Sequence, residues 1–335
     1  MSNDDSIQGA VLDVDSSGTL DDVDLDEALK RALRGGPVVT DAHLRLLERD
    51  IVVGSTKTSL HCYFLPLDGN GRVRFKPLAE FLRDRIVDYA IPRRAIEEAQ
   101  RQMASTGSVA PIAKLQAQAR AVFTHLTQSG EGGELLLFAM AEAAFGLTQI
   151  LCKMSLNTSA SMHYHGADGV YASARPDGGL NIYWGESKIY EDATAAIRNC
   201  LESLAPYLVE SEGEDAVRER DLLLVNEFAN FTDQRLVDAL RFFLDKDAQK
   251  SLSVRQCGIA LVAFDCASYP SEKAEKTLEK IESEIKAQLP NWRTSVERRV
   301  GHENLQNFDI HFICIPLPSS EAFRAYFLHL LGYRK

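Results

Sequence analysis

Apolar and polar residues repeat along this chain with two different periods, which predict helices and strands in turn. Apolar residues at helical spacing predict helices over 77–91, 93–103, 112–126, 132–153, 191–208, 216–244 and 271–289, with a final helix at the C-terminus. Short runs rich in aromatic and β-branched residues predict strands at 58–67, 257–265 and 308–317. Strands that alternate with helices indicate an α/β protein whose central sheet is covered on both faces.

The segment HGADGVYASARPDGGLNIYWGESKIY, residues 165–190, predicts a β-hairpin. Its middle, residues 175–179, suits a type I turn followed by a glycine with positive φ, which is the usual three-residue hairpin loop. This turn sets the register of the two strands and places Asp168 opposite Glu186. One face of the hairpin is therefore apolar until its end, where two carboxylates meet.

Like charges directly opposed across two strands destabilise a sheet, so a cation is expected between Asp168 and Glu186. Lys188 lies on the same face as Glu186, because strand side chains repeat every two residues, and it offsets one of the charges. A hard divalent ion such as Mg²⁺ would offset both. The alternative is a surface salt bridge between Glu186 and Lys188, with Asp168 closing a turn with Gly169. A register error of one residue would move Asp168 to the opposite face.

Charge divides the chain into three regions. Residues 1–36 form an acidic lead that we expect to be mobile, and its first 30 residues hold nine acids and one lysine. They leave about −3 of the net charge of −11 for the rest of the chain. We expect an N-terminal strand and helical region at 37–130 and an α/β core at 131–335.

Basic residues gather in the helical region, and two interpretations of them stay open. They could face phosphates, or they could lie on solvated helix faces paired with Glu80, Asp84 and Glu97. The residues concerned are Arg72, Arg74, Lys76, Arg83, Arg85, Arg93, Arg94 and Arg101. The acidic lead could dock on this basic segment or on a partner, or it could serve only solubility.

The order of the charged residues resembles a known enzyme core. An acid, a hairpin turn and then E-x-K on the next strand, with a helix acid before and a helix after, resembles the PD-(D/E)XK nucleases. That resemblance implies a restriction-endonuclease-like core, a central mixed sheet flanked by helices, with N-terminal helical additions. It implies that Asp168 and Glu186 bind Mg²⁺, with Mn²⁺ as a substitute, and that Lys188 is the catalytic lysine. Gly166 and Ala167 stand where the name-giving motif has a proline.

The helix acid of that core is assigned to Glu134, which would be both catalytic and a metal ligand, with Glu142 as second choice. A helix N-terminal acid that stabilises the macrodipole is the plainer interpretation of Glu134.

A narrower resemblance covers most of the chain. The blocks GGELLLFAMAEAAFGL, HYHGADGVYA, IYWGESKIYEDATAAI and FDIHFICIPLP are similar to the small nuclease subunit of the Hachiman antiphage defence system, the HamA-like proteins. The resemblance implies a DNA-degrading effector, a deoxyribonuclease that a helicase subunit restrains in a heterodimer. A catalytically silent nuclease fold, serving as a regulatory or docking subunit, is the alternative.

Other chemistries have weaker support in the sequence. His163 and His165 with Asp168 only partly match the zinc site of metallo-β-lactamase-like hydrolases. The stretch VVGSTKTS, residues 52–59, has Thr56 where a phosphate loop needs glycine, so any ATP-driven step would come from a partner. No apolar run is long enough for a membrane span and no signal peptide is evident, so we expect a cytoplasmic protein without membrane contact.

Overall fold

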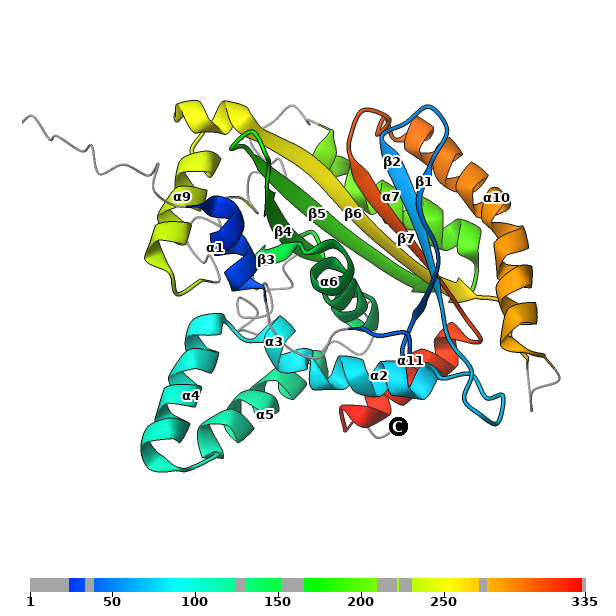
Figure 1. Ribbon diagram of the computed structural model, residues 1–335, viewed down its shortest axis with the longest axis horizontal. Coiled ribbons are helices and arrows are strands. Elements are labelled where there is room, and N and C mark those ends of the chain that lie inside the picture. The colour runs from blue at the N-terminus through cyan, green and yellow to red at the C-terminus, as the bar shows by residue number, and fades with distance from the viewer. Residues whose placement is uncertain are drawn as a thin grey trace, which may run out of the picture.

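One mixed sheet of seven strands forms the centre of the computed structural model (Figure 1), which describes residues 24–33, 39–124, 131–151, 166–209, 222, 231–270 and 276–332. The strands are β1 (Arg45–Val52), β2 (Thr58–Phe64), β3 (Thr148–Leu151), β4 (Gly169–Ala174), β5 (Leu180–Tyr190), β6 (Val254–Asp265) and β7 (Ile310–Leu317). The helices are α1 (Leu25–Ala32), α2 (Phe75–Asp84), α3 (Ile86–Ala90), α4 (Arg93–Thr106), α5 (Ala110–Thr124), α6 (Glu131–Phe145), α7 (Ala193–Leu208), α9 (Gln234–Leu244), the 3₁₀ helix η3 (Gln249–Ser253), α10 (Leu278–His302) and α11 (Ser320–Leu330).

The strand order is β1-β2-β7-β6-β5-β4-β3. The central strands β2, β7, β6 and β5 are parallel to one another. At one edge β1 is antiparallel to β2, and at the other edge β4 is antiparallel to β5 and β3 is antiparallel to β4. Every residue of strand β6 from Cys257 to Phe264 is buried, and the run holds no polar side chain. A parallel strand covered on both faces reads as a continuous apolar run, so the predicted α/β class with a mixed sheet is confirmed.

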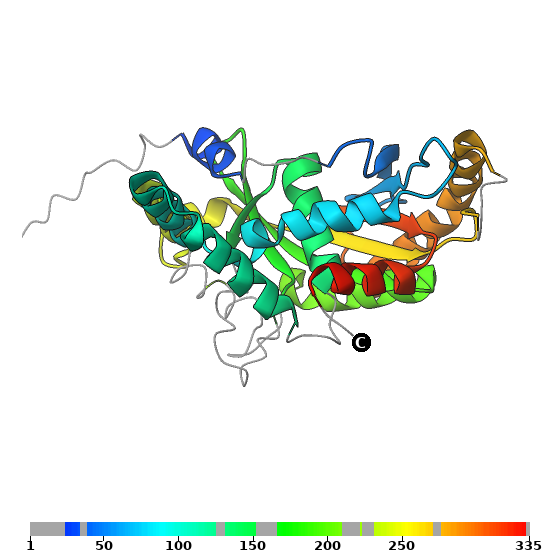
Figure 2. The same ribbon diagram turned by 90° about the horizontal axis from the view of Figure 1, so that it is seen from below.

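Helices cover both faces of the sheet (Figures 1 and 2). Helix α6 packs on one face, where Gly133 approaches the side chain of Ser187. Helix α7 packs on the other face, where Tyr207 stacks on Trp184 with ring centroids 5.2 Å apart, and α10 packs against α7. Helices α4 and α5 pair side by side and extend away from the sheet in Figure 1.

The sequence pattern missed two strands. Residues 148–151 were predicted to continue a helix, but they form β3, because α6 ends at Phe145 and Gly146 adopts a positive φ of 63°. Strand β1 pairs with β2 through two irregularities in register, and these irregularities disrupt the two-residue alternation by which a strand is recognised.

Two helices also differ from expectation. The end of the predicted mobile lead forms α1, where Asp24 caps the first turn and Leu29 is buried against the core. Helix α10 continues to His302 through Pro290, where the prediction ended it, because Trp292 and Val296 extend its buried stripe. No helix in the described ranges is long and apolar enough to cross a membrane.

Candidate active site

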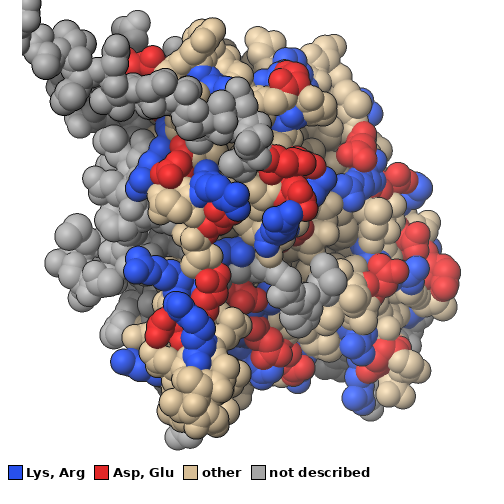
Figure 3. All heavy atoms as spheres, turned by 60° about the vertical axis from the view of Figure 1, so that its left-hand side comes forward, with Lys and Arg blue, Asp and Glu red and all other residues tan. Residues whose placement is uncertain are grey.

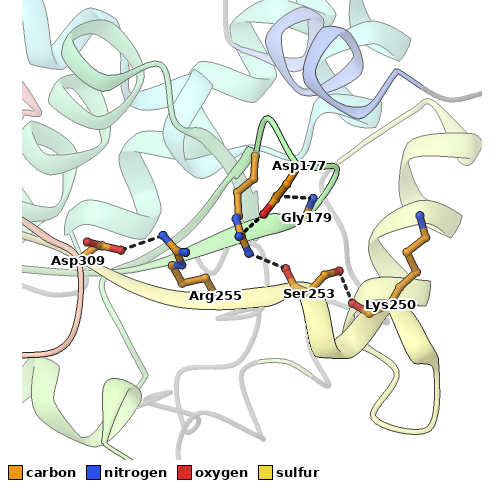
Figure 4. Close-up of polar contacts among 7 residues, drawn as sticks. Asp177, Gly179, Lys250, Ser253, Arg255 and Asp309 are labelled. Carbon is orange, nitrogen blue, oxygen red and sulfur yellow. Dashed lines mark hydrogen bonds and ion pairs between the residues drawn. The ribbon is translucent and has the colours of Figure 1, made fainter.

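The tip of the β4–β5 hairpin is fixed by polar contacts (Figure 4). The backbone N–H of Arg175 donates to Gly179 O at 2.8 Å, and Gly178 takes a φ of 78°. The Arg175 side chain forms an ion pair with Asp177 and donates to Ser253 O, 3.2 Å away in the residue that precedes β6. These are the features of the three-residue loop that the sequence predicted.

The register that this loop sets is the predicted one. Val170 lies opposite Trp184, and the ladder runs as far as the pair of Gly169 and Gly185. Strand β5 continues five residues beyond that pair, to Tyr190, while β4 begins at Gly169. The residues that follow Gly185 on β5 therefore lack a β4 neighbour.

Asp168 does not simply face Glu186 but forms hydrogen bonds to backbone groups of β5 where its unpaired part begins. Its backbone N–H donates to Gly185 O at 2.8 Å, which departs by one residue from the register of the hairpin. Its carboxylate oxygen Oδ2 accepts from the backbone N–H of Ser187 at 2.8 Å and from the Ser187 hydroxyl at 2.7 Å. The expected opposition of two carboxylates is thus relieved, because the Ser187 N–H, which has no partner on β4, offers Asp168 a donor.

Glu186 and Lys188 form a close pair next to Asp168. Glu186 is only 4% exposed, and Lys188 Nζ lies 3.2 Å from its Oε2. Burial lowers the pKa of Lys188, but the negative charges of Glu186 and Asp168 outweigh burial, and the pKa is raised overall. Lys188 is therefore an ammonium ion at neutral pH. Because Glu186 is buried, the pair is not the surface salt bridge of the plainer interpretation.

Glu134, in the first turn of α6, is connected to Asp168 through Tyr89. The hydroxyl of Tyr89, on α3, donates to Glu134 Oε2 at 2.8 Å and lies 3.3 Å from the backbone oxygen of Asp168. Tyr89 is 3% exposed. Burial, followed by the negative charge of Glu134, raises its pKa well above the ordinary value, so the hydroxyl stays protonated and donates. Tyr89 thus links the helix acid to Asp168.

Glu142, the second choice for the helix acid, has a different role. Its Oε2 lies 3.0 Å from Arg85 on α2's C-terminal side, and both side chains are about 5% exposed or less. Arg85 also lies 3.5 Å from Asp88 and over the ring of Phe138. Glu142 is therefore half of a buried ion pair between helices, and Glu134 is the acid linked to Asp168.

The donor set offers two carboxylates, the ligand type that a hard divalent ion prefers. Oδ2 of Asp168 takes both Ser187 donors, whereas its Oδ1 accepts no hydrogen bond from the part of the chain that is described. Mg²⁺ commonly uses one or two protein carboxylates and completes its shell with water and phosphate oxygens. Within the described ranges, no three His, Cys, Asp or Glu side chains come together as a metal site. Glu134, Asp168 and Glu186 are therefore not gathered as a three-ligand set in this part of the chain.

The other candidates from the sequence do not join this site. His163 and His165 lie outside the described residues. Residues 54–57 form the turn between β1 and β2, where Thr56 N–H donates to Val53 O at 3.2 Å, and no helix follows to bind a phosphate.

The basic segment is not a uniform patch. Arg83 pairs with Asp84 at 2.8 Å, as the plainer interpretation expected, and Arg101 pairs with Glu98 at 2.7 Å. Glu97 accepts instead from Thr232 at 2.9 Å. Figure 3 shows basic and acidic side chains intermixed on this side of the molecule. The segment therefore favours solvated, paired faces over a surface that faces phosphates.

Tyr89 and Ser187 are the site residues that sequence reasoning missed. Ser187 occupies the middle of E-x-K, but the sequence pattern does not specify that β4 begins at Gly169 and so gives no sign that the Ser187 N–H needs a partner. No signal in the sequence connects Tyr89 to Asp168, because 79 residues separate them.

A protein-family model described as HamA matches residues 41–331. The matched range contains all seven strands, Tyr89, and the four predicted site residues, and it leaves out α1. No curated protein matches the chain.

Proposed function

The chain belongs to the HamA family of the Hachiman antiphage defence system, and from this premise we propose that it is a metal-dependent deoxyribonuclease that acts in that defence. The observation that carries the proposal is that Asp168 hydrogen-bonds to Ser187, the residue between the ion-paired Glu186 and Lys188, at the open end of the β4–β5 hairpin. Two carboxylates and an ammonium ion at one end of a hairpin are suited to phosphodiester hydrolysis.

Each side chain has a distinct part in this proposal. Asp168 and Glu186 would hold Mg²⁺, or Mn²⁺ in its place. When bound, the ion polarises the scissile phosphate and makes a water ligand more acidic. Lys188 is protonated, so it holds the attacking water by donating a hydrogen bond and offsets the charge that develops on the phosphate. It does not act as a general base.

Glu134 would complete the site without being required as a third metal ligand. Tyr89 occupies one of its carboxylate oxygens, 2.8 Å away, and connects it to the backbone of Asp168. We propose that Glu134 orients water at the site, since a carboxylate accepts hydrogen bonds from water.

A helicase partner is the second part of the proposal. We propose that the chain forms a heterodimer with the helicase subunit of the same defence system and that the helicase blocks the path of DNA until it engages DNA itself. The near-neutral charge of residues 31–335 supports this, because a protein that binds DNA alone usually presents a basic surface. Full cleavage by the isolated chain, unchanged when the helicase is added, would contradict the restraint.

Metal dependence tests the nuclease assignment. Cleavage of plasmid DNA is measured with Mg²⁺, with Mn²⁺ and with EDTA, for the wild type and for Glu186→Gln. The matched control is Glu191→Gln, which alters an exposed acid five residues further along the same segment. We expect EDTA and Glu186→Gln to abolish cleavage and Glu191→Gln to leave it unchanged. Undiminished cleavage in EDTA would rule the mechanism out.

A docking subunit without catalysis is the competing function. A docking function predicts that the double substitution Glu186→Ala, Lys188→Ala changes neither the amount of intact DNA nor partner binding. The nuclease proposal predicts that the same protein loses DNA cleavage and keeps partner binding.

A further inference from the structure

The middle residue of the E-x-K motif makes the contacts that fix Asp168. Ser187 is 2% exposed and gives both of its donors, the backbone N–H at 2.8 Å and the hydroxyl at 2.7 Å, to Oδ2 of Asp168. Hydrogen bonds to a carboxylate are stronger than those between neutral groups, and two donors on one oxygen fix the direction of the group. A single residue, through its backbone N–H and its hydroxyl, thus determines which oxygen of Asp168 is occupied.

Helix α6 holds the hydroxyl of Ser187 in place. Gly133 lies so close that a Cβ added to it would stand 2.9 Å from Ser187 Oγ and 3.3 Å from Ser187 Cβ. Only the absence of a side chain at Gly133 allows the helix to approach the strand with the hydroxyl in its present position. The neighbouring Gly132 is different, because its Cβ would meet its nearest atoms at 3.7 Å or more.

We infer that Ser187 is a positioning residue for the metal site: it holds Oδ2 of Asp168 and so reserves Oδ1 for the divalent ion, and Gly133 holds Ser187 in that role. This inference rests on the proposed function, since it concerns the same site. It adds a residue that contacts neither substrate nor metal but sets the geometry of one that does.

Ser187→Ala tests the hydroxyl directly. The substitution keeps the hydrogen bond from the backbone N–H to Asp168. We therefore expect metal affinity to fall about tenfold, the lower end of the range seen when hydrogen-bond partners of metal ligands are replaced. Mn²⁺ binding is measured by electron paramagnetic resonance on the protein without DNA, and the Mg²⁺ dependence of cleavage is measured in parallel. The midpoint of the Mg²⁺ titration should shift by the same factor, with most of the rate recovered at saturating Mg²⁺.

The control for this variant is Ser173→Ala in the same hairpin. The Ser173 hydroxyl accepts from Asn181 at 3.3 Å, far from Asp168, so its loss should not change Mn²⁺ binding. A second pair of variants alters no polar group. Gly133→Ala should rotate the Ser187 hydroxyl away and weaken Mn²⁺ binding, whereas Gly132→Ala should not.

Three outcomes separate the possibilities. Weakened Mn²⁺ binding in Ser187→Ala and Gly133→Ala, with both controls unchanged, supports the inference. Wild-type affinity in Ser187→Ala, even with a lower melting temperature, overturns it and leaves the nuclease proposal standing. A wild-type protein that binds no Mn²⁺ and cleaves no DNA overturns the proposed function itself.

Discussion

Replacing Glu142 should destabilise the protein, whereas replacing Glu134 should inactivate it. Glu142 and Arg85 are both buried and 3.0 Å apart, and removing one member of such a pair leaves an uncompensated charge that costs about 3–5 kcal/mol. Arg85 keeps Asp88 at 3.5 Å, so we expect the Glu142→Gln variant to lose about 3 kcal/mol. At about 2 °C per kcal/mol for a chain of this size, its melting temperature should fall by roughly 6 °C.

Glu134→Gln is the counterpart of that change. The glutamine oxygen can still accept from Tyr89, and Glu134 is half-buried rather than buried, so we expect a change of only about 0.5 kcal/mol in the free energy of unfolding. Thermal unfolding followed by circular dichroism measures both variants beside Glu98→Gln, which breaks an exposed ion pair of little value. A Glu142→Gln protein as stable as wild type, or a Glu134→Gln protein that cleaves DNA normally, would refute these assignments.

Three further predictions follow from other parts of the molecule. Burial and the neighbouring His311 lower the pKa of His61 to about 4. Between pH 6.5 and 4 the unfolded chain therefore binds a proton that the folded chain does not, and the free energy of unfolding falls as the pH falls. Lowering the pH from 7 to 5 should cost about 2 kcal/mol by urea unfolding, and an equally steep loss in His61→Gln would contradict this origin. Tyr89→Phe removes the 2.8 Å donor to Glu134 and should lower cleavage about tenfold with little change in partner binding; an unchanged rate would show that the link is not needed. Deleting residues 1–23, which spares the α1 cap at Asp24, should tighten salt-sensitive DNA binding or weaken helicase binding if the acidic lead docks, and should change neither if it only solubilises.

The sequence alone was sufficient for the hairpin because a short turn determines its register. The residues 175–179 admit one loop geometry, and this geometry placed Gly169 opposite Gly185 without knowledge of the rest of the fold. Buried parallel strands were equally recognisable, since β6 and β7 are continuous apolar runs. Asp168, Glu186 and Lys188 were selected as candidate site residues by the same local reasoning.

Long-range contacts were beyond that reasoning. Glu134 and Glu142 have similar sequence surroundings, and only the partners Tyr89 and Arg85, each more than 40 residues away, distinguish their roles. The turn of the Asp168 carboxylate toward Ser187 depends on where β4 ends, which the alternating pattern does not specify. Strand β3 has only four residues, too few for an alternation to be distinguished from the end of a helix.

DNA cleavage by the complex of this chain with its helicase subunit tests the central claim most directly. Wild type, Asp168→Asn, Lys188→Met and the control Glu191→Gln are compared in Mg²⁺ under conditions in which the helicase engages DNA, with complex formation verified for each by gel filtration. We predict that wild type and Glu191→Gln degrade the DNA, and that Asp168→Asn and Lys188→Met form the complex but leave the DNA intact. Degradation by Asp168→Asn at the wild-type rate would contradict the assignment of this site.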